Sequence, residues 1–329
     1  MGASILFRIG CCLVLVSSAP ADQARLLGPR VGPEREAALR KYGGGPETEK
    51  GVLAGLDWLA RHQEPDGTWD ADQFPSRCEE GGDLCDGIGK GQHGEAVPCP
   101  FDTPMTALVA LAFLGHSHPP DRGFGDAAPF REGSDVPYTA LCVQALLAAR
   151  EAGFELPDDL APGVDRFFSS LENRGGRLAY LLEGRKYGYT PTATNAHLAA
   201  ATRLLLQVGL AGSQHRSYMT LLGKSRPQWQ ISFKTLEIPG QGTREVHVGS
   251  LSMYQWWYGT IAAFHKGGAT WTNWYAATNK TLLEHQRKQG CARESWDPLG
   301  TYERQTGGRV FATALGVLML EQPYRQRRL

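Results

Sequence analysis

The residues best suited to chemistry in this sequence stand at the beginnings of its apolar runs. Asp102 and Asp135 each lie four positions before a threonine that opens such a run. Two carboxylates at one rim could serve as general acid and base. Aspartates at helix starts also cap free backbone N–H groups, and this is the favoured interpretation. Asp102 and Asp135 are therefore the candidates for catalytic residues, but the sequence does not predict that the protein is a catalyst.

A second group of residues at the same run beginnings could contact a ligand. Trp256, Trp257 and Tyr258 form an aromatic cluster, which core packing explains equally well. Arg309 opens its run at the electropositive end of a helix, where a cation is unfavourable unless an anion such as Asp102, Asp135 or a ligand faces it. The ligand-contact candidates are Tyr138, Tyr189, Asn195, Trp256, Trp257, Tyr258 and Arg309.

The elements that must position these residues repeat along the chain. The runs open at Thr106, Thr139, Thr194, Thr260 and Thr313, which are 33, 55, 66 and 53 positions apart. Repeats of this size indicate stacked supersecondary units. The apolar positions recur at helical spacing, and strand-like alternation is nearly absent outside 231–233 and 246–248. The sequence therefore predicts an all-α fold.

The expected helices alternate with polar turns. They cover 52–63, 106–114, 138–152, 164–171, 192–208, 252–265, 271–288 and 309–324, with a weaker helical stretch over 213–225. Segment 70–100 lacks periodicity and is expected to be a long loop that contains three cysteines. Only twenty residues separate Leu114 from Asp135, too few for a further helix with its two turns.

Two of the expected helices end in a similar phrase. Gln63 and Gly67 precede Trp69, Gln286 and Gly290 precede Trp296, and a degenerate copy spans 171–180. This Gln-x3-Gly…Trp spacing resembles the QW repeat of squalene–hopene cyclases and related protein prenyltransferase repeats, over roughly residues 47–324. The resemblance implies an α/α toroid of about five inner and four outer helices, with one outer helix missing. The glutamine could tie off backbone groups at a helix end while the aromatic ring packs on the next repeat.

The chain departs from that family at the catalytic motifs. Cyclases that begin by protonation use Asp-x-Asp-Asp, and the nearest string here, 70–73, lies directly after a QW-like turn. Zinc-dependent prenyltransferases use an Asp-x-Cys pair and a distant histidine, of which Asp83 and Cys85 match only the first part. The loose candidates for the second part are His93, His116 and His118. We therefore expect no metal site and no cofactor.

The ends and the charge of the chain limit its partners. Lys+Arg 34 balances Asp+Glu 34, which offers no electrostatic footprint for nucleic acid. Residues 1–21 follow the plan of a signal peptide, 22–46 are expected to be a linker, and 47–329 the toroid domain with its Cys-containing loop at 70–100. A secreted or periplasmic location follows, with no integral membrane segment after the leader is removed.

The cysteines that remain after leader removal are odd in number. A local disulfide between two of Cys78, Cys85 and Cys99 is plausible in an exported chain, and Cys142 is expected to be a buried thiol. Cys291 is the fifth. At least one thiol is then free or pairs outside the chain.

Three functions fit these observations. The leading hypothesis is an exported toroid protein that binds a small apolar or isoprenoid-like ligand in its central cavity, with catalysis unproven. The alternatives are a carbohydrate-active lyase or hydrolase on the same ring, which closely spaced carboxylates would favour, and a non-enzymatic scaffold. A central cavity filled with side chains would favour the scaffold. The ring could be open on one side, or closed by the 70–100 loop, a partner or a second copy.

Overall fold

The computed structural model describes residues 32–71, 73–78, 85, 102–115, 136–151, 158, 160–172, 177–179, 193–224, 226–229, 233–238, 242–247, 252–298, 300, 303 and 306–328. The chain is all-α apart from one hairpin. Its elements are α1 (Gly32–Lys41), α2 (Pro46–Arg61), η1 (Phe74–Arg77), α3 (Asp102–Gly115), α4 (Val136–Glu151), α5 (Leu160–Leu171), α6 (Ala193–Leu206), α7 (Ser213–Lys224), β1 (Phe233–Ile238), β2 (Gly242–His247), α8 (Met253–Lys266), α9 (Gly268–His285), α11 (Gly308–Leu320) and α12 (Gln322–Arg325). The all-α prediction is confirmed, and each expected helix has a counterpart.

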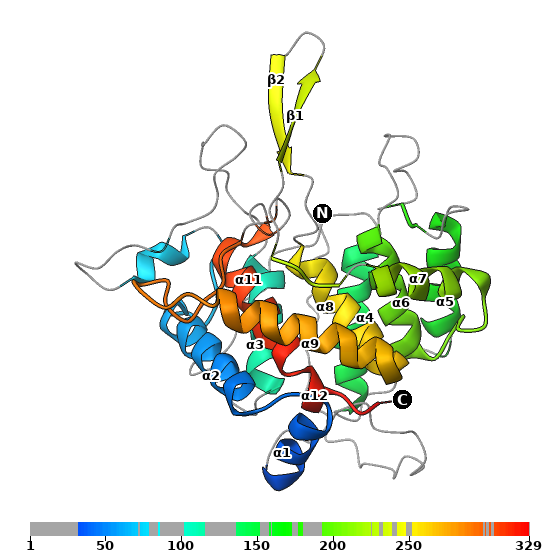
Figure 1. The fold of residues 1–329 in the computed structure, drawn as a ribbon, viewed down its shortest axis with the longest axis horizontal. Helices are drawn as coiled ribbons and strands as arrows, with labels where there is room; N and C mark the ends of the chain where they lie inside the picture. Colours follow the sequence, from blue (N-terminus) through cyan, green and yellow to red (C-terminus); the bar gives the residue numbers. More distant parts are fainter. Residues whose placement is uncertain are drawn as a thin grey trace, which may run out of the picture.

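Two elements differ from the expectation. The stretch 22–46, expected to be a linker, contains α1, whose Ala38 and Leu39 are buried against Tyr324. Arg35 anchors this helix through an ion pair with Glu49 at 2.5 Å. The antiparallel hairpin of β1 and β2 projects away from the helical body (Figure 1), and only fragments of its pattern are visible in the sequence.

The helices pack in two rows. In one row α3 packs against α11, α11 against α8, α8 against α6, and α6 against α4. In the other row α2 covers α11 and α3, α9 covers α8 and α11, α7 covers α6 and α8, and α5 covers α6. Helix α2 also contacts α9, so the beginning of the described chain lies beside its last repeat (Figure 1). Within the described residues, α3 and α4 do not pack closely against each other.

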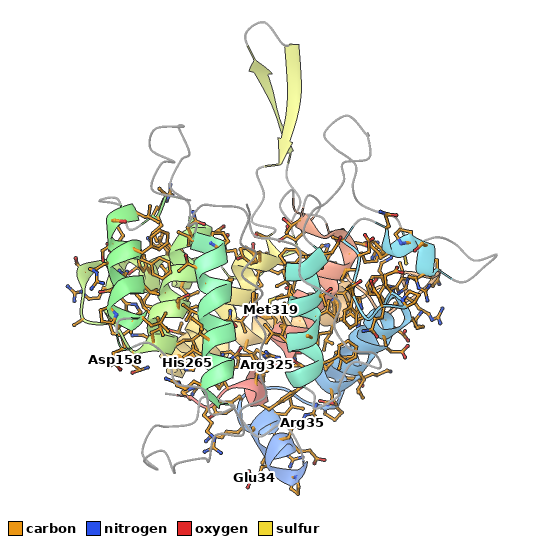
Figure 2. All side chains as sticks on the ribbon, turned by 180° about the vertical axis from the view of Figure 1, so that it is seen from behind. Glu34, Arg35, Asp158, His265, Met319 and Arg325 are labelled. Atoms are coloured by element: carbon orange, nitrogen blue, oxygen red, sulfur yellow. The ribbon has the colours of Figure 1, made fainter. Side chains whose placement is uncertain are left out.

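The interior between the rows is filled by large side chains. Met319 of α11 is fully buried near the middle of the molecule (Figure 2). Trp274 of α9 lies so close to α8 that a Cβ on Gly259 would overlap its ring, and its indole N–H donates to Thr260 Oγ1 at 2.9 Å. A glycine is required there because the indole occupies the place of a side chain.

The first QW-like turn joins α2 to α3 through one tryptophan. The indole Nε1 of Trp69 donates to the carbonyl of Leu59 at 2.7 Å, and its backbone N–H donates to Thr106 Oγ1 at 2.9 Å. The first bond gives a second donor to a carbonyl at the helix end that also accepts the backbone N–H of His62 at 3.2 Å. The second explains why a threonine opens the next run.

The second QW-like turn repeats this pattern between α9 and α11. Trp296 Nε1 donates to the carbonyl of Leu282 at 2.8 Å, and its backbone N–H donates to Thr313 Oγ1 at 3.3 Å. The ring lies between α2 and α11, where Cβ atoms on Gly55 and Gly316 would be 3.0 and 2.7 Å from it. The tryptophan of the last repeat therefore packs directly on the first helix hairpin.

The glutamines of both turns donate to backbone carbonyls, but these carbonyls are not the helix-end groups that were expected from the sequence. Gln63 Nε2 donates to the carbonyl of Gly67 at 2.9 Å, where φ is 90°. Gln286 Nε2 donates to the carbonyls of Glu294 at 2.8 Å and of Gly51 at 2.9 Å. The second glutamine thus also binds α2.

Within the described residues, none of the helices has both the length and the apolar character needed to cross a membrane.

Replacing Thr106 by valine tests the tie between turn and helix. Thr106→Val keeps the shape but leaves the buried N–H of Trp69 without its acceptor, so we expect a loss of about 1–3 kcal/mol in the free energy of unfolding. Chemical denaturation measures it. Thr220→Val, at an exposed threonine that bonds only within α7, is the control, and an equal loss in both variants would contradict the assignment.

The pH dependence of stability tests the buried histidine of α6. Burial lowers the pKa of His197 to about 4, below its value of about 6.5 in the unfolded chain. The unfolded state therefore binds the proton first, so stability falls as the pH drops from about 6.5 to 4, by up to about 1.4 kcal/mol per pH unit from this group. His197→Gln should reduce that slope, and an unchanged slope would contradict the interpretation.

Candidate metal centre

Four potential metal ligands meet where the two QW-like turns face each other. His62 follows the last residue of α2, Cys78 follows η1, and Cys85 lies in the loop beyond it. Cys291 comes from the turn after α9. One ligand atom from each of these side chains lies within 4.8 Å of the others.

The distances fit a tetrahedral ion. His62 Nε2 lies 3.8 Å from Cys78 Sγ, 3.4 Å from Cys85 Sγ and 3.7 Å from Cys291 Sγ. Zinc binds sulfur at about 2.3 Å and imidazole nitrogen at about 2.0 Å, and a tetrahedron with these bonds has nitrogen-to-sulfur edges of about 3.6 Å. The cluster is therefore already spaced for a four-coordinate ion.

The imidazole of His62 is held with the correct nitrogen facing the sulfurs. Its Nδ1 lies 2.8 Å from the carbonyl oxygen of Trp58, and because a carbonyl only accepts, Nδ1 carries the proton. The ring also stacks on the indole of Trp58, with centroids 4.2 Å apart. The lone pair of Nε2 is thereby directed at the three thiols, the arrangement that backbone carbonyls give metal-bound histidines.

The three sulfurs are free thiols. Cys78, Cys85 and Cys291 form no disulfide, so the expected local bridge is not formed between Cys78 and Cys85. Cys99, the other candidate partner, and the side chain of Cys142 lie outside the described residues. The backbone N–H of Cys85 instead donates to Cys78 Sγ at 3.1 Å, a contact that stabilises a thiolate.

The protonation states also suit a metal. Burial lowers the pKa of His62 to about 4, so the ring is a neutral ligand at pH 7. Burial is likewise the largest cause that raises the pKa of Cys78 and of Cys85. Metal binding would therefore displace thiol protons, as at zinc–thiolate sites generally.

Positive charge surrounds the cluster. The charges of Arg61, Arg309 and Arg77 all act on His62 to lower its pKa. A divalent ion with three thiolates and one neutral imidazole carries a net charge of −1, since 2 − 3 = −1. These arginines oppose protonation of the imidazole and would stabilise the metal-bound form.

The second QW-like turn provides an internal reference. His285 also precedes the glutamine, places Nδ1 2.9 Å from the carbonyl of Thr281, and stacks on Trp229 with centroids 4.5 Å apart. Its turn is four residues longer between glycine and tryptophan, and Cys291 lies in that insertion. Both turns therefore orient their histidine in the same way, whereas the three thiols gather only around His62 among the described residues.

The catalytic candidates do not form a pair in the described residues. Asp102 Oδ1 accepts the backbone N–H of Ala71 at 2.8 Å, which ties the loop after the first turn to α3. Asp135 and Tyr189 lie outside the described residues, as does the side chain of Tyr138. The contact shown for Asp102 is therefore with a loop and not with the start of its own helix, so the helix-capping interpretation stays a prediction.

Arg309 is buried with Asp297, a carboxylate that was not among its expected partners. It is 1% exposed, and its Nη2 lies 2.7 Å from Asp297 Oδ1 while Nη1 donates to Ser295 Oγ at 3.0 Å. The expected anions were Asp102, Asp135 or a ligand. Asp297 takes that position because it directly follows Trp296, whose turn rests on the same helix.

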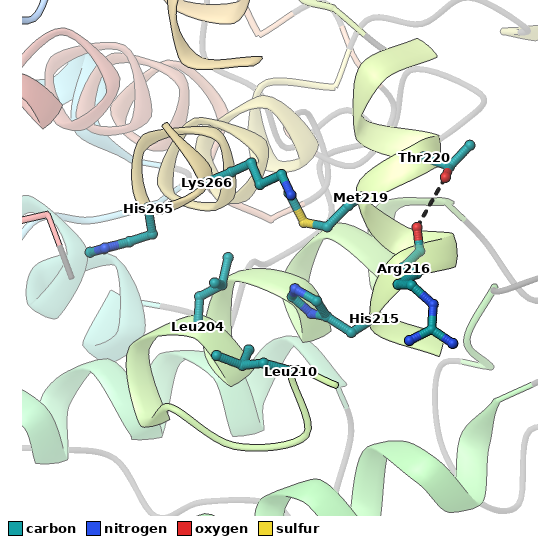
Figure 3. Close-up of a pocket in the computed structure, with 8 residues that line it drawn as sticks. All are labelled: Leu204, Leu210, His215, Arg216, Met219, Thr220, His265 and Lys266. Atoms are coloured by element: carbon teal, nitrogen blue, oxygen red, sulfur yellow. Dashed lines mark hydrogen bonds between the residues drawn. The ribbon is translucent and has the colours of Figure 1, made fainter. Parts of the chain in front are cut away.

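The aromatic candidates are core residues. Trp256, Trp257 and Tyr258 are at most 1% exposed, and Asn195 donates to the carbonyl of Leu178 at 3.3 Å. None of the five ligand-contact candidates whose side chains are described lines the pocket that the structure shows between α6, α7 and α8 (Figure 3).

That pocket has a volume of about 520 Å³ and a mixed lining. Its apolar side chains are Leu204, Leu210 and Met219, and Lys266 of α8 extends over them toward Met219 (Figure 3). His215 also lines it, and its buried Nδ1 has no hydrogen-bond partner among the described residues. The lining contains no carboxylate.

Sequence reasoning missed the metal ligands because they are far apart. Cys85 was considered with Asp83 and in a local disulfide, and His62 was not considered as a ligand. Cys291 lies 206 positions after Cys85, so no local motif links them. The available signal was weak: a histidine at a helix end, followed by two cysteines, and a cysteine inserted in the matching turn.

Comparisons with protein-family models, curated proteins and solved structures find no match for this chain.

Proposed function

We propose that this chain is a zinc-dependent helical scaffold, in which His62, Cys78, Cys85 and Cys291 bind one Zn²⁺ ion. The observation that carries the proposal is the spacing of the three sulfurs around His62 Nε2, at 3.4–3.8 Å. Four protein ligands leave no open coordination position, which is the mark of a structural rather than a catalytic zinc site.

The donor set selects the metal class. Three thiolates and an imidazole are soft to borderline ligands, whereas Ca²⁺ and Mg²⁺ prefer six or more oxygen ligands or octahedral coordination. A tetrahedral Cys₃His set is typical of zinc. The cage that we propose is therefore specific for zinc over the hard divalent cations.

The scaffold role is supported by the burial of the aromatic residues that were ligand-contact candidates. The aromatic cluster that was expected to wall a cavity is packed in the core. We further propose that the two rows of helices form an incomplete α/α toroid of the squalene-cyclase and prenyltransferase type, supported by the repeated tryptophan and glutamine contacts of both turns. Export through a leader at 1–21, with a secreted or periplasmic location, stays part of this proposal on the sequence alone.

Metal analysis of the purified chain tests the proposed site. We expect about one zinc per chain by elemental analysis, and loss of stoichiometric zinc in His62→Ala and Cys85→Ser, because each removes a buried ligand. His285→Ala is the matched control, since it removes the equivalent histidine of the other turn. Cobalt substitution should give the visible spectrum of a tetrahedral thiolate site.

Two results would contradict the zinc proposal. One is a metal-free wild-type chain that takes up no zinc under reducing conditions. The other is equal zinc loss in His62→Ala and His285→Ala, which would indicate a general effect on folding.

A second candidate function is the binding of an apolar molecule with an anionic head group in the pocket of Figure 3. The apolar floor, the absence of carboxylates from the lining, and the cation of Lys266 favour such a ligand. Pockets of this kind are mostly apolar with a few placed polar groups. This second candidate keeps the apolar ligand expected from the sequence, but places it in the pocket between α6, α7 and α8 and not in a central cavity.

Decanoate is a suitable probe for this pocket. Calorimetric titration should show saturable binding to the wild-type chain, weakened at least about tenfold in Lys266→Ala by loss of a charge-assisted contact. Lys280→Ala, at an exposed lysine of α9, is the charge-matched control. Absence of binding, or equal weakening in both variants, would reject this candidate.

A further inference from the structure

The ligands of the proposed metal site come from the two ends of the helical arrangement. His62, Cys78 and Cys85 belong to the first helix hairpin and its loop, whereas Cys291 belongs to the last repeat. We call the boundary where α2 and α3 lie against α9 and α11 the seam. The metal cluster therefore lies across the seam and not within one repeat.

Hydrogen bonds join the two sides along the length of α2. Thr48 Oγ1 donates to Asn279 Oδ1 at 3.0 Å near its beginning, and Gln286 donates to the carbonyl of Gly51 at 2.9 Å. The C-terminal end of α2 is held differently. There Trp58 Nε1 donates to the carbonyl of Cys291 at 3.2 Å, directly beside the cluster.

Two further contacts cross the seam toward that end. The ring of Trp296 packs on α2 at Gly55. Arg61 pairs with Glu294 at 2.6 Å, but the two side chains are 25% and 36% exposed, and ion pairs of that exposure add little stability. Three protonated thiols add no strong attraction of their own. A metal ion would add four ligand bonds, of which the one to Cys291 crosses the seam.

We propose that the bound zinc ion locks the seam, so that metal occupancy controls how firmly the end of α2 stays docked on the turn after α9. This inference rests on the proposed zinc site. The effect of the ion is expected to be local. The four ligands lie at one end of the seam, and helices α5, α6 and α7 contribute none of them. Removal of zinc is therefore expected to loosen the seam locally and to leave those helices unchanged.

Two variants of the proposed zinc ligands separate the binding of zinc from its effect on the docking of α2 across the seam. Cys291→Ala keeps His62, Cys78 and Cys85, which all belong to one side of the seam. Cys78→Ala also keeps three ligands, but they include Cys291 on the opposite side. Both cysteines are half-buried, so the two truncations are closely matched in every respect except whether zinc still bridges the seam.

Hydrogen exchange measured by mass spectrometry tests the lock. In the zinc-loaded wild-type chain, addition of EDTA should speed exchange at least tenfold in residues 55–69 and 286–296, with no change in α5 to α7. With saturating zinc present, Cys78→Ala should keep both segments protected, and Cys291→Ala should not. His285→Ala should behave like the wild-type chain.

Each other outcome has a definite meaning. Stoichiometric zinc whose removal leaves both segments unchanged would overturn the lock and leave the zinc site standing. Equal protection in Cys78→Ala and Cys291→Ala would overturn it too, as would a uniform rise in exchange over all helices. A chain that binds no zinc would overturn both proposals.

Discussion

The tie between the end of one helix and the start of the next is the constraint on which this fold depends. In both complete turns a tryptophan donates its indole N–H to a carbonyl near the end of the helix that it follows, at Leu59 and Leu282, and each of these carbonyls also accepts a backbone N–H. Because the same residue gives its backbone N–H to the next threonine, the end of one helix determines where the next begins.

The proposed metal centre is a consequence of that turn geometry. A histidine before the turn glutamine is directed by the carbonyl four residues earlier, and this holds for His62 and for His285 alike. Only at His62 do cysteines from the following loop and from the neighbouring turn reach the free ring nitrogen. A common way of ending a helix thus becomes a metal site where two turns face each other.

The helices could be predicted because their periodicity is local, and the turn contacts because glutamine, glycine and tryptophan lie within a few positions. The partners of Arg309 and the ligand Cys291 could not, since both depend on which distant turns meet. Helix α1 escaped notice because its polar sequence buries only Ala38 and Leu39, against a tyrosine near the other end of the chain. No local pattern in the sequence indicates that the first helix hairpin packs against the last repeat.

The convergence of three sulfurs on the free Nε2 of His62 distinguishes a metal site from a mere group of thiols. With an oxidant to accept two electrons, two of three nearby cysteines could form a disulfide, which would leave one thiol over and give the histidine no role. The fixed Nδ1 contact instead directs Nε2 at all three sulfurs at nearly equal distances. The neighbouring arginines would balance the extra negative charge that three thiolates bring to a divalent ion. A tetrahedral cation accounts for all of these features together, and a disulfide accounts for none of those that involve the histidine.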